Sequence, residues 1–308
     1  MSEPAEEPVP VEEPAPEPEP TEGEEPAPEP EPPTVAEQAL ISHLANICIP
    51  CAENCGSKLS TQAQAVHGMI GAKTRHFYNR LLELPDARCL EVGVWKGAAS
   101  AALMDGNAAH ITFVDNWSEF GRVRRHFMST LAAFRGDNTT ALVEANVFNL
   151  DPASLPHRPY NVYVYDARHG EQDHYNALAR MLPALADTFI YVCDDWNWSE
   201  VRQGTARAIA DLGLMILGQH EKRLTQDNNH TRPSVGASCW WNGSWSAVLR
   251  KPPAPAPAST TSLSPEEEEE PAPEPTEGEE PAPEPTEGEE PAPEPAPAEE
   301  PPVEEPPV

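Results

Sequence analysis

The sequence predicts an α/β domain with a doubly wound, mostly parallel β-sheet, placed between two acidic tails. Short apolar runs alternate with amphipathic segments through the middle of the chain, and every aromatic residue and cysteine lies there. The two ends are dominated by Pro, Glu and Ala. Strands that alternate with helices of ten or more residues are typical of parallel βαβ units. The alternation alone indicates the α/β class and nothing finer.

The expected elements follow one another without long gaps. Residues 35–47 and 60–84 are predicted helices that precede the sheet. Apolar runs predict strands at 88–92, 110–115, 141–144, 160–166, 188–194, 215–220 and 245–249. Amphipathic segments predict helices at 97–103, 118–134, 172–185 and 200–212. Because the last two strands lack a helix between them, we expect an antiparallel strand at one edge of the sheet.

The charge of the chain is concentrated in its ends. The 308 residues contain 20 Lys and Arg against 51 Asp and Glu, a net charge of −31. Residues 1–33 hold 12 Glu and residues 254–308 hold 18 Glu, and neither segment has a Lys or Arg. The middle is therefore close to neutral. We predict disordered acidic Pro-rich tails at 1–33 and 254–308 around one domain at 34–253, because the tails have too few apolar residues to offset the entropy of ordering.

The tails share a repeated unit, Pro-Ala-Pro-Glu-Pro-Thr-Glu-Gly-Glu-Glu, found at 271–280 and again at 281–290. Such a composition favours an extended chain. Two roles stay open, a solubilising spacer and a tether to a basic or Pro-recognising partner. With no secretory signal or apolar stretch near 20 residues, we expect a cytoplasmic protein.

A glycine-containing turn follows the first predicted strand. Glu91, Gly93 and Gly97 form the pattern Glu-x-Gly-x-x-x-Gly, in which a ligand can approach the backbone beside a helix start. A tight turn without a ligand is the alternative. Asp115 ends the next strand, about 20 residues later, where a carboxylate suits the two hydroxyls of a ribose. Its alternative role is the N-cap of the following helix.

Three further carboxylates, those of Asp166, Asp194 and Asp195, end the fourth and fifth predicted strands. Carboxyl ends of parallel strands share one edge of a sheet, so these groups should meet in one crevice. Three oxygen ligands suit a hard cation such as Mg²⁺. The alternative is capping and ion pairing with Arg168, Arg202 or Arg207.

Together these residues resemble those of class I S-adenosylmethionine (SAM)-dependent methyltransferases. The similarity is greatest to metal-assisted O-methyltransferases and to methyltransferase-domain proteins of the macrocin O-methyltransferase type. It covers residues 60–251 and includes Thr74-Arg-His-Phe-Tyr-Asn79 and the run from Asp194 to Thr205. Ala167 stands where the family usually has glycine.

The resemblance implies a Rossmann-like, seven-stranded sheet and assigns roles to single residues. Glu91, Gly93 and Gly97 would surround the methionine part of SAM, and Asp115 would hold its ribose. The cation, expected to be Mg²⁺, would be bound by Asp166, Asp194 and Asp195. His169 would be the general base, since a neutral imidazole accepts a proton near neutral pH, and the alternative for it is a structural role.

The expected activity is SAM-dependent methyl transfer to a hydroxyl of a small-molecule or sugar substrate, with no nucleic acid or membrane involved. One alternative is a non-catalytic Rossmann-like scaffold or binding module. Another is an NAD-dependent oxidoreductase, although the turn lacks the Gly-x-Gly-x-x-Gly of dinucleotide-binding folds.

Two residue groups lie outside this scheme. Cys48, Cys51 and Cys55, with His43, allow a zinc site, but only one short Cys spacing fits one, so free thiols are favoured. Five tryptophans are expected either to wall the substrate site or to pack in the core: Trp196, Trp198, Trp240, Trp241 and Trp245.

Overall fold

The computed structural model describes residues 31–121 and 123–253. The predicted tails at 1–33 and 254–308 therefore lie outside the described residues, apart from residues 31–33. No helix in the described ranges is long and apolar enough to cross a bilayer.

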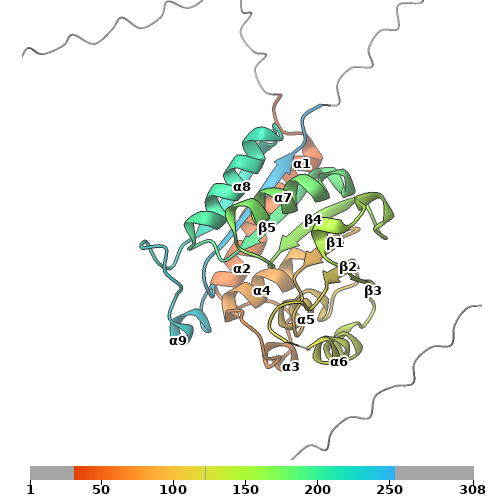
Figure 1. Ribbon diagram of the computed structural model, residues 1–308, viewed down its shortest axis with the longest axis vertical. Coiled ribbons are helices and arrows are strands. Elements are labelled where there is room, and N and C mark those ends of the chain that lie inside the picture. The colour runs from red at the N-terminus through yellow and green to blue at the C-terminus, as the bar shows by residue number, and fades with distance from the viewer. Residues whose placement is uncertain (1–30, 122, 254–308) are drawn as a thin grey trace, which may run out of the picture. The chain divides into compact units, whose positions relative to one another are not determined.

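A single seven-stranded sheet runs through the domain in the order β3-β2-β1-β4-β5-β7-β6 (Figure 1). Strands β1 to β5 pair in parallel, and β7 is antiparallel to both β5 and β6. The predicted Rossmann-like fold is confirmed, with the antiparallel strand one place inside the edge. The strands are β1 (Arg88–Val92), β2 (His110–Asp115), β3 (Thr139–Glu144), β4 (Tyr160–Tyr165), β5 (Leu185–Asp194), β6 (Met215–Lys222) and β7 (Ser244–Arg250).

Helices cover both faces of the sheet. The longer ones are α1 (Val35–Ser42), α4 (Ala72–Leu81), α5 (Ala98–Met104), α6 (Arg124–Phe134), α7 (Glu171–Met181) and α8 (Ser199–Asp211). A π-helical turn, His43–Cys48, joins α1 to α2 (Ile49–Glu53), and α3 (Thr61–Gln64) and α9 (Pro233–Gly236) are single turns.

Two apolar cores lie on opposite faces of the sheet. One contains Phe77 of α4, Leu103 of α5 and Phe127 of α6. The other contains Leu178 of α7 and Val201 of α8. Strand residues alternate between the two faces, as in Leu90 and Cys89 of β1, which belong to different cores. Helices thus bury the parallel sheet on both faces, and ligands can reach it only at the ends of its strands.

Two predicted helices differ from the structure. The expected helix 60–84 is divided into α3 and α4, and the segment 66–71 between them runs toward the sheet edge. The expected helix 118–134 begins only at Arg124. Trp117 and Phe120 have φ of 48° and 53°, left-handed values that no right-handed helix can contain. Residues 116–121 therefore form a loop beside the carboxyl end of β2.

Candidate functional site

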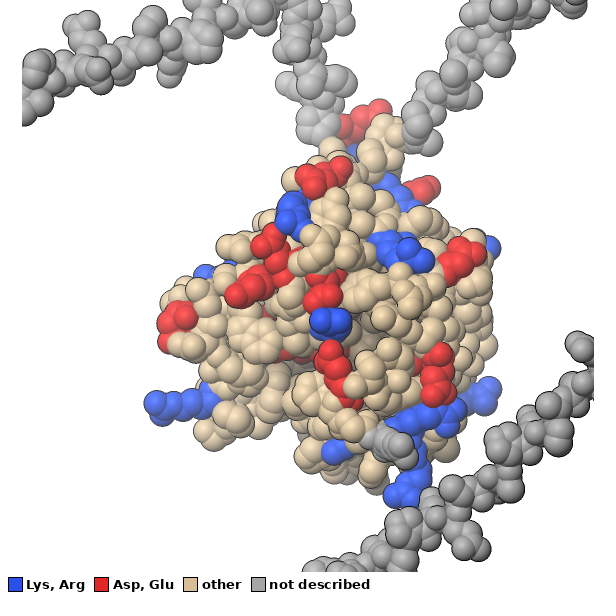
Figure 2. Space-filling model, viewed as in Figure 1, with Lys and Arg blue, Asp and Glu red and all other residues tan. Residues whose placement is uncertain are grey.

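A cavity of about 350 Å³ opens where β1, β2, β4 and β5 end. This volume lies within the range of small-molecule sites. Six of the eight residues predicted as site residues line it: Gly93, Asp115, Asp166, His169, Asp194 and Asp195. Glu91 and Gly97 are not among its lining residues. On the face shown in Figure 2, side chains of both charge signs are present, as expected for a nearly neutral domain.

The two glycines of the turn are required by the backbone. Gly93 has φ of +89°, and a Cβ there would lie 1.8 Å from the carbonyl oxygen of Asp166. Gly97 has φ of +88° and is the N-cap of α5. A Cβ on Gly97 would come within 3.0 Å of Thr130 on α6. Gly93 thus keeps the ends of β1 and β4 close together at the cavity floor, whereas Gly97 packs α5 against α6.

Asp115 braces the glycine turn. Its Oδ2 accepts hydrogen bonds from the backbone N–H groups of Val94 and Trp95, each at 2.9 Å. Its Oδ1 accepts one from the N–H of Trp117 at 2.7 Å. The N-cap of α6 is Val123, so Asp115 does not cap that helix. Because each carboxylate oxygen has two lone pairs, Oδ1 keeps capacity for a ligand hydroxyl.

Unlike Asp115, the acids at the ends of β4 and β5 are poorly supplied with hydrogen-bond donors. Asp194 is 3% exposed and Asp195 is 7% exposed. Within residues 31–121 and 123–253, no donor reaches the Oδ1 of either residue. Burial and the charges of Asp166 and Asp195 raise the pKa of Asp194 well above its usual range. Burial and the charge of Asp195, then that of Asp115, do the same for the pKa of Asp166.

The three arginines considered as partners point elsewhere. Arg168 lies 3.7 Å from Glu119 and 3.6 Å from Asp173. Arg207 pairs with Glu171 at 2.5 Å. Arg202 donates to the carbonyls of Trp196 and Asn197. Of the ion pairs in the described part of the chain, the only one made by these acids joins Asp195 to His169.

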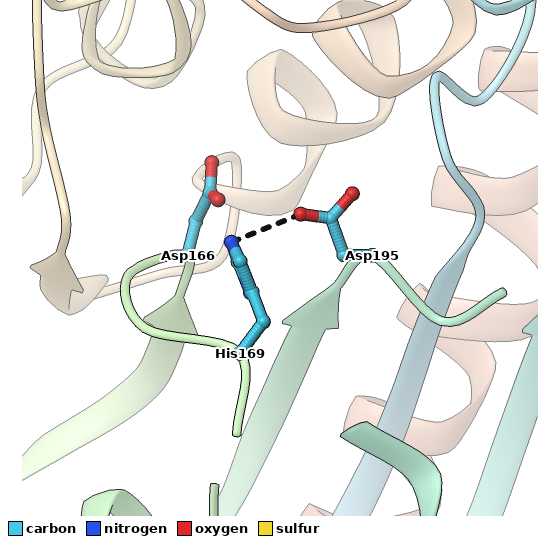
Figure 3. A group of neighbouring side chains, drawn as sticks. All are labelled: Asp166, His169 and Asp195. Carbon is cyan, nitrogen blue, oxygen red and sulfur yellow. Dashed lines mark ion pairs between the residues drawn. The ribbon is translucent and has the colours of Figure 1, made fainter. Parts of the chain in front are cut away.

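One group of side chains is arranged as metal ligands (Figure 3). Asp166, His169 and Asp195 offer ligand atoms that all lie within 4.8 Å of one another. In the described ranges, this is the one set of three or more His, Cys, Asp or Glu residues with that property. Asp194 lines the cavity but is not in the set, whereas His169, expected as a base, is.

The cysteines do not form such a group. All six are free thiols. Cys51 Sγ is 3.0 Å from the carbonyl oxygen of Gly56 and donates to it. Cys48 is buried, and burial raises the pKa of its thiol, so a metal-binding thiolate is disfavoured there. The favoured interpretation as thiols fits this arrangement.

Glu91 lies behind the cavity on β1. Its side chain is completely buried, and no hydrogen-bond partner for either carboxylate oxygen is found among the described residues. Burial raises its pKa to about 8 against the lowering effect of the nearby Ser100 hydroxyl, and the charges of Asp166 and Asp115 act in the same direction as burial. Its contact with the methionine part of a cofactor stays a prediction.

An aromatic wall extends from the ligand group along one side of the cavity. The rings of His169 and Trp198 are 5.1 Å apart, Trp198 and His230 are 5.9 Å apart, and His230 and Trp241 are 5.8 Å apart. Trp198 and Trp241 thus belong to the site, whereas three tryptophans are buried in the core: Trp196, Trp240 and Trp245.

Sequence reasoning missed three parts of the lining: Gly68–Ile70, Asn146–Phe148 and His230. Gly68 approaches α5 so closely that a Cβ there would lie 2.2 Å from the Cβ of Ala98. The sequence Gly68-Met-Ile-Gly71 inside an expected helix is the one signal that indicated a break at this point. His230 lies in a loop without a motif, and nothing in the sequence singles it out.

Residues 90–196 match the family model described as a methyltransferase domain. A search of curated proteins gives no match.

Several solved structures resemble the chain at low sequence identity. A putative caffeoyl-CoA O-methyltransferase from Staphylococcus aureus is 12% identical, covering 70% of this chain and 99% of that one, with a TM-score of 0.44. The O-methyltransferase TomG from Streptomyces achromogenes, in complex with SAM, is 12% identical, with coverages of 71% and 91% and a TM-score of 0.39. A putative methyltransferase from Thermoplasma acidophilum is 16% identical, with coverages of 54% and 69% and a TM-score of 0.36.

The matched region contains the end of β1, strands β2 to β5, the glycine turn and all of the acids that line the cavity. Residues 90–196 are therefore similar to a methyltransferase domain, and they lie in a sheet with a Rossmann-like strand order.

Proposed function

We propose that the protein transfers a methyl group from SAM to a hydroxyl of a small molecule, assisted by a divalent cation. One observation carries this proposal. A single cavity joins a glycine turn braced by Asp115 to an acidic group in which Oδ1 of Asp194 and Oδ1 of Asp195 have no hydrogen-bond donor among the described residues.

The first half of the cavity fits the cofactor. Gly93 keeps the floor free of side chains, and Asp115 Oδ1 has room to accept a ribose hydroxyl. Asn146, Val147 and Phe148 line the same side and would enclose an adenine ring. The sulfonium of SAM is positive, so acids farther along the cavity complement it.

The second half fits a cation. Asp166 and Asp195 supply oxygens to one point, and Oδ1 of Asp195 has no donor from the described residues. A cation there supplies charge that lowers the pKa of an acceptor hydroxyl. In the metal-assisted scheme that the sequence predicts, His169 then accepts the proton, and the hydroxyl oxygen takes the methyl group while the carbon–sulfur bond breaks.

The aromatic wall defines the acceptor side. Trp198 and Trp241 line the cavity, with Trp198 next to His169, and Arg168 is turned toward Glu119 and Asp173. Flat rings bind aromatic or sugar rings by stacking and apolar contact. We therefore propose an uncharged ring that bears a hydroxyl as the acceptor. A cytoplasmic location is a further part of the proposal, and for the tails both predicted roles, a solubilising spacer and a tether, stay open.

A thermal-shift panel tests the function. The full chain is heated with SAM, S-adenosylhomocysteine or NAD, each with and without Mg²⁺ or Mn²⁺. A ligand at a hundredfold excess over its Kd adds about 2.7 kcal/mol of stability. We expect a shift with both SAM compounds and none with NAD. A shift with NAD alone would indicate an oxidoreductase, and no shift with any compound would support the non-catalytic scaffold.

A further inference from the structure

His169 is the residue whose position differs most from its predicted role. A general base must direct a nitrogen lone pair at the acceptor hydroxyl. Instead, Nε2 of His169 points between two carboxylates, and it lies 3.0 Å from Oδ2 of Asp195 (Figure 3). The ring therefore faces the point where a cation would be held.

The spacing of these atoms suits coordination. Two neighbouring ligands, each about 2.1 Å from one octahedral ion, are separated by about 3.0 Å. The measured separation of Nε2 and Oδ2 equals this edge. Asp166 offers a third atom within 4.8 Å, on the other side of the imidazole.

Packing fixes the imidazole in this orientation. His169 has its ring edge-on to Trp198 at 5.1 Å, and it stacks on His174 at 5.9 Å with an interplanar angle of 28°. His174 is completely buried on α7. Rotation of the His169 ring toward the acceptor side would require these two neighbours to move.

Hydrogen bonding leaves Nε2 available as a ligand. Nδ1 of His169 is buried and, in the part of the chain that the structure describes, has no partner. Without a cation, Nε2–H pairs with Oδ2 of Asp195 at 3.0 Å, and a cation between the two atoms would displace that proton. The tautomer with its lone pair on Nε2 meets a carboxylate oxygen at 3.0 Å, an arrangement that is favourable only when a cation lies between them.

The identity of the donor atoms decides which cation is preferred. Mg²⁺ is bound in proteins almost entirely by oxygen. An imidazole nitrogen suits first-row transition metals, whose affinity for nitrogen-containing sites increases along the Irving–Williams order. A set of one imidazole and two carboxylates is therefore a poor match for Mg²⁺ and a good one for Mn²⁺, Fe²⁺, Co²⁺ or Zn²⁺.

We infer that His169 is a metal ligand, together with Asp166 and Asp195, and that the site takes a divalent transition metal in preference to Mg²⁺. This inference rests on the proposed cation-assisted function and replaces the predicted base role of His169. It leaves Asp194 lining the cavity without a place among the ligands.

The test is metal binding by the full chain, without any substrate. Calorimetric titrations with MnCl₂ and MgCl₂ give the ratio of the two affinities. We expect one Mn²⁺ per chain and at least tenfold weaker Mg²⁺ binding. In the Mn²⁺-loaded protein, electron spin-echo spectroscopy should show modulation from a directly bonded imidazole nitrogen.

His169→Ala should weaken Mn²⁺ binding by more than about tenfold and remove the nitrogen modulation, with a smaller loss for Mg²⁺. His126→Ala, on the exposed face of α6, is the matched control and should bind Mn²⁺ like the wild type. The wild-type spectrum decides the question even if His169→Ala fails to fold.

Tight Mn²⁺ binding without nitrogen modulation, or equal affinities for the two metals, would overturn the inference. Such a result would not affect the thermal shift caused by SAM. The methyltransferase proposal would therefore stand even if the inference about His169 failed. If neither SAM compound raised the unfolding temperature while the Mn²⁺ spectrum still showed a bonded nitrogen, the metal site would stand and the methyltransferase proposal would fail.

Discussion

The two halves of the cavity satisfy their carboxylates in opposite ways. At the end of β2, Asp115 accepts three backbone hydrogen bonds and holds the glycine turn in place. At the end of β5, Asp194 and Asp195 are buried with one oxygen each that no described residue contacts. The first half supplies its carboxylate with backbone donors, whereas the second leaves these two oxygens without a hydrogen-bond donor among the described residues. Asp115 therefore stabilises the folded state, whereas the burial of Asp194 and Asp195 is explained by ligand binding and not by stability.

Opposite effects on stability follow from this difference. A carboxylate with backbone donors stabilises the folded state when it is ionised. A buried carboxylate without donors or cations destabilises it when it is ionised. Substitutions in the two halves should therefore change the free energy of unfolding with opposite signs, and the variants below follow in order of expected effect.

Gly93→Ala should have the largest effect. The added Cβ would lie 1.8 Å from the carbonyl oxygen of Asp166, in a backbone conformation that L-residues rarely adopt. We expect a loss of about 4 kcal/mol or more in urea unfolding. Gly121→Ala is the matched control, with φ of +83° and no atom within 4 Å of the new Cβ, and it should cost about 1 kcal/mol. Equal losses would show that the close approach of β1 and β4 is unimportant.

Glu91→Gln should stabilise the ligand-free protein in a pH-dependent way. The pKa of Glu91 is raised from 4.5 to about 8. The folded state therefore holds this proton more tightly than the unfolded state. Stability is unaffected below about pH 4.5 and falls as the pH rises toward 8. Removing the carboxyl should add on the order of 3 kcal/mol at pH 8.5 and little at pH 4.5.

Unfolding curves at several pH values measure this effect. Glu144→Gln, in the half-exposed ion pair with Arg124, is the control and should change stability by less than about 1 kcal/mol. A pH-independent difference between wild type and Glu91→Gln would mean that Glu91 is ionised and solvated.

Asp115→Ala should destabilise the protein by about 2 kcal/mol, since three backbone N–H groups lose their acceptor. The SAM-induced thermal shift should be lost as well. Asp227→Ala, an exposed acid that accepts only from Asn229, should behave like the wild type in both assays. Retained SAM binding in Asp115→Ala would remove this residue from the ribose site.

Asp194→Asn should stabilise the metal-free protein by about 1 kcal/mol at pH 8. It removes a buried charge next to Asp166 and Asp195, and these raise the pKa of Asp194. Thermal unfolding in the presence of a chelator measures the gain. A loss of stability would mean that Asp194 is already neutralised, and the contrast with Asp115 would fail.

The sequence predicted the strands and helices of the molecule better than the side-chain contacts inside the site. Strands β1 and β2 begin and end at the predicted residues, because β1 stops at the turn that starts with Gly93 and β2 is an apolar run between His110 and Asp115. The seven-stranded, Rossmann-like sheet was implied by the family resemblance, and its strand order was not predicted, since periodicity does not encode which strands pair. The start of α6 could not be predicted, because Trp117 and Phe120 adopt left-handed backbone angles that their residue types disfavour.

The sequence also could not predict which side chains group with His169. Successive residues at a strand end point to different sides, so Asp194 and Asp195 cannot occupy equivalent positions. Which of the two meets His169 depends on the backbone after β5, where Asp195 has φ of 54°. The position of His169 depends in turn on the loop between β4 and α7 and on the packing of Trp198. These are tertiary properties that spacing along the chain does not contain.

Diffraction at the manganese absorption edge tests the central claim most directly. Crystals of the full chain grown with S-adenosylhomocysteine and MnCl₂ should show one anomalous peak within bonding distance of Asp166 and Asp195. The nucleoside should lie over Gly93, with its ribose at Asp115. Nucleoside and manganese at a different site, or an empty cavity at saturating concentrations of both, would contradict the account.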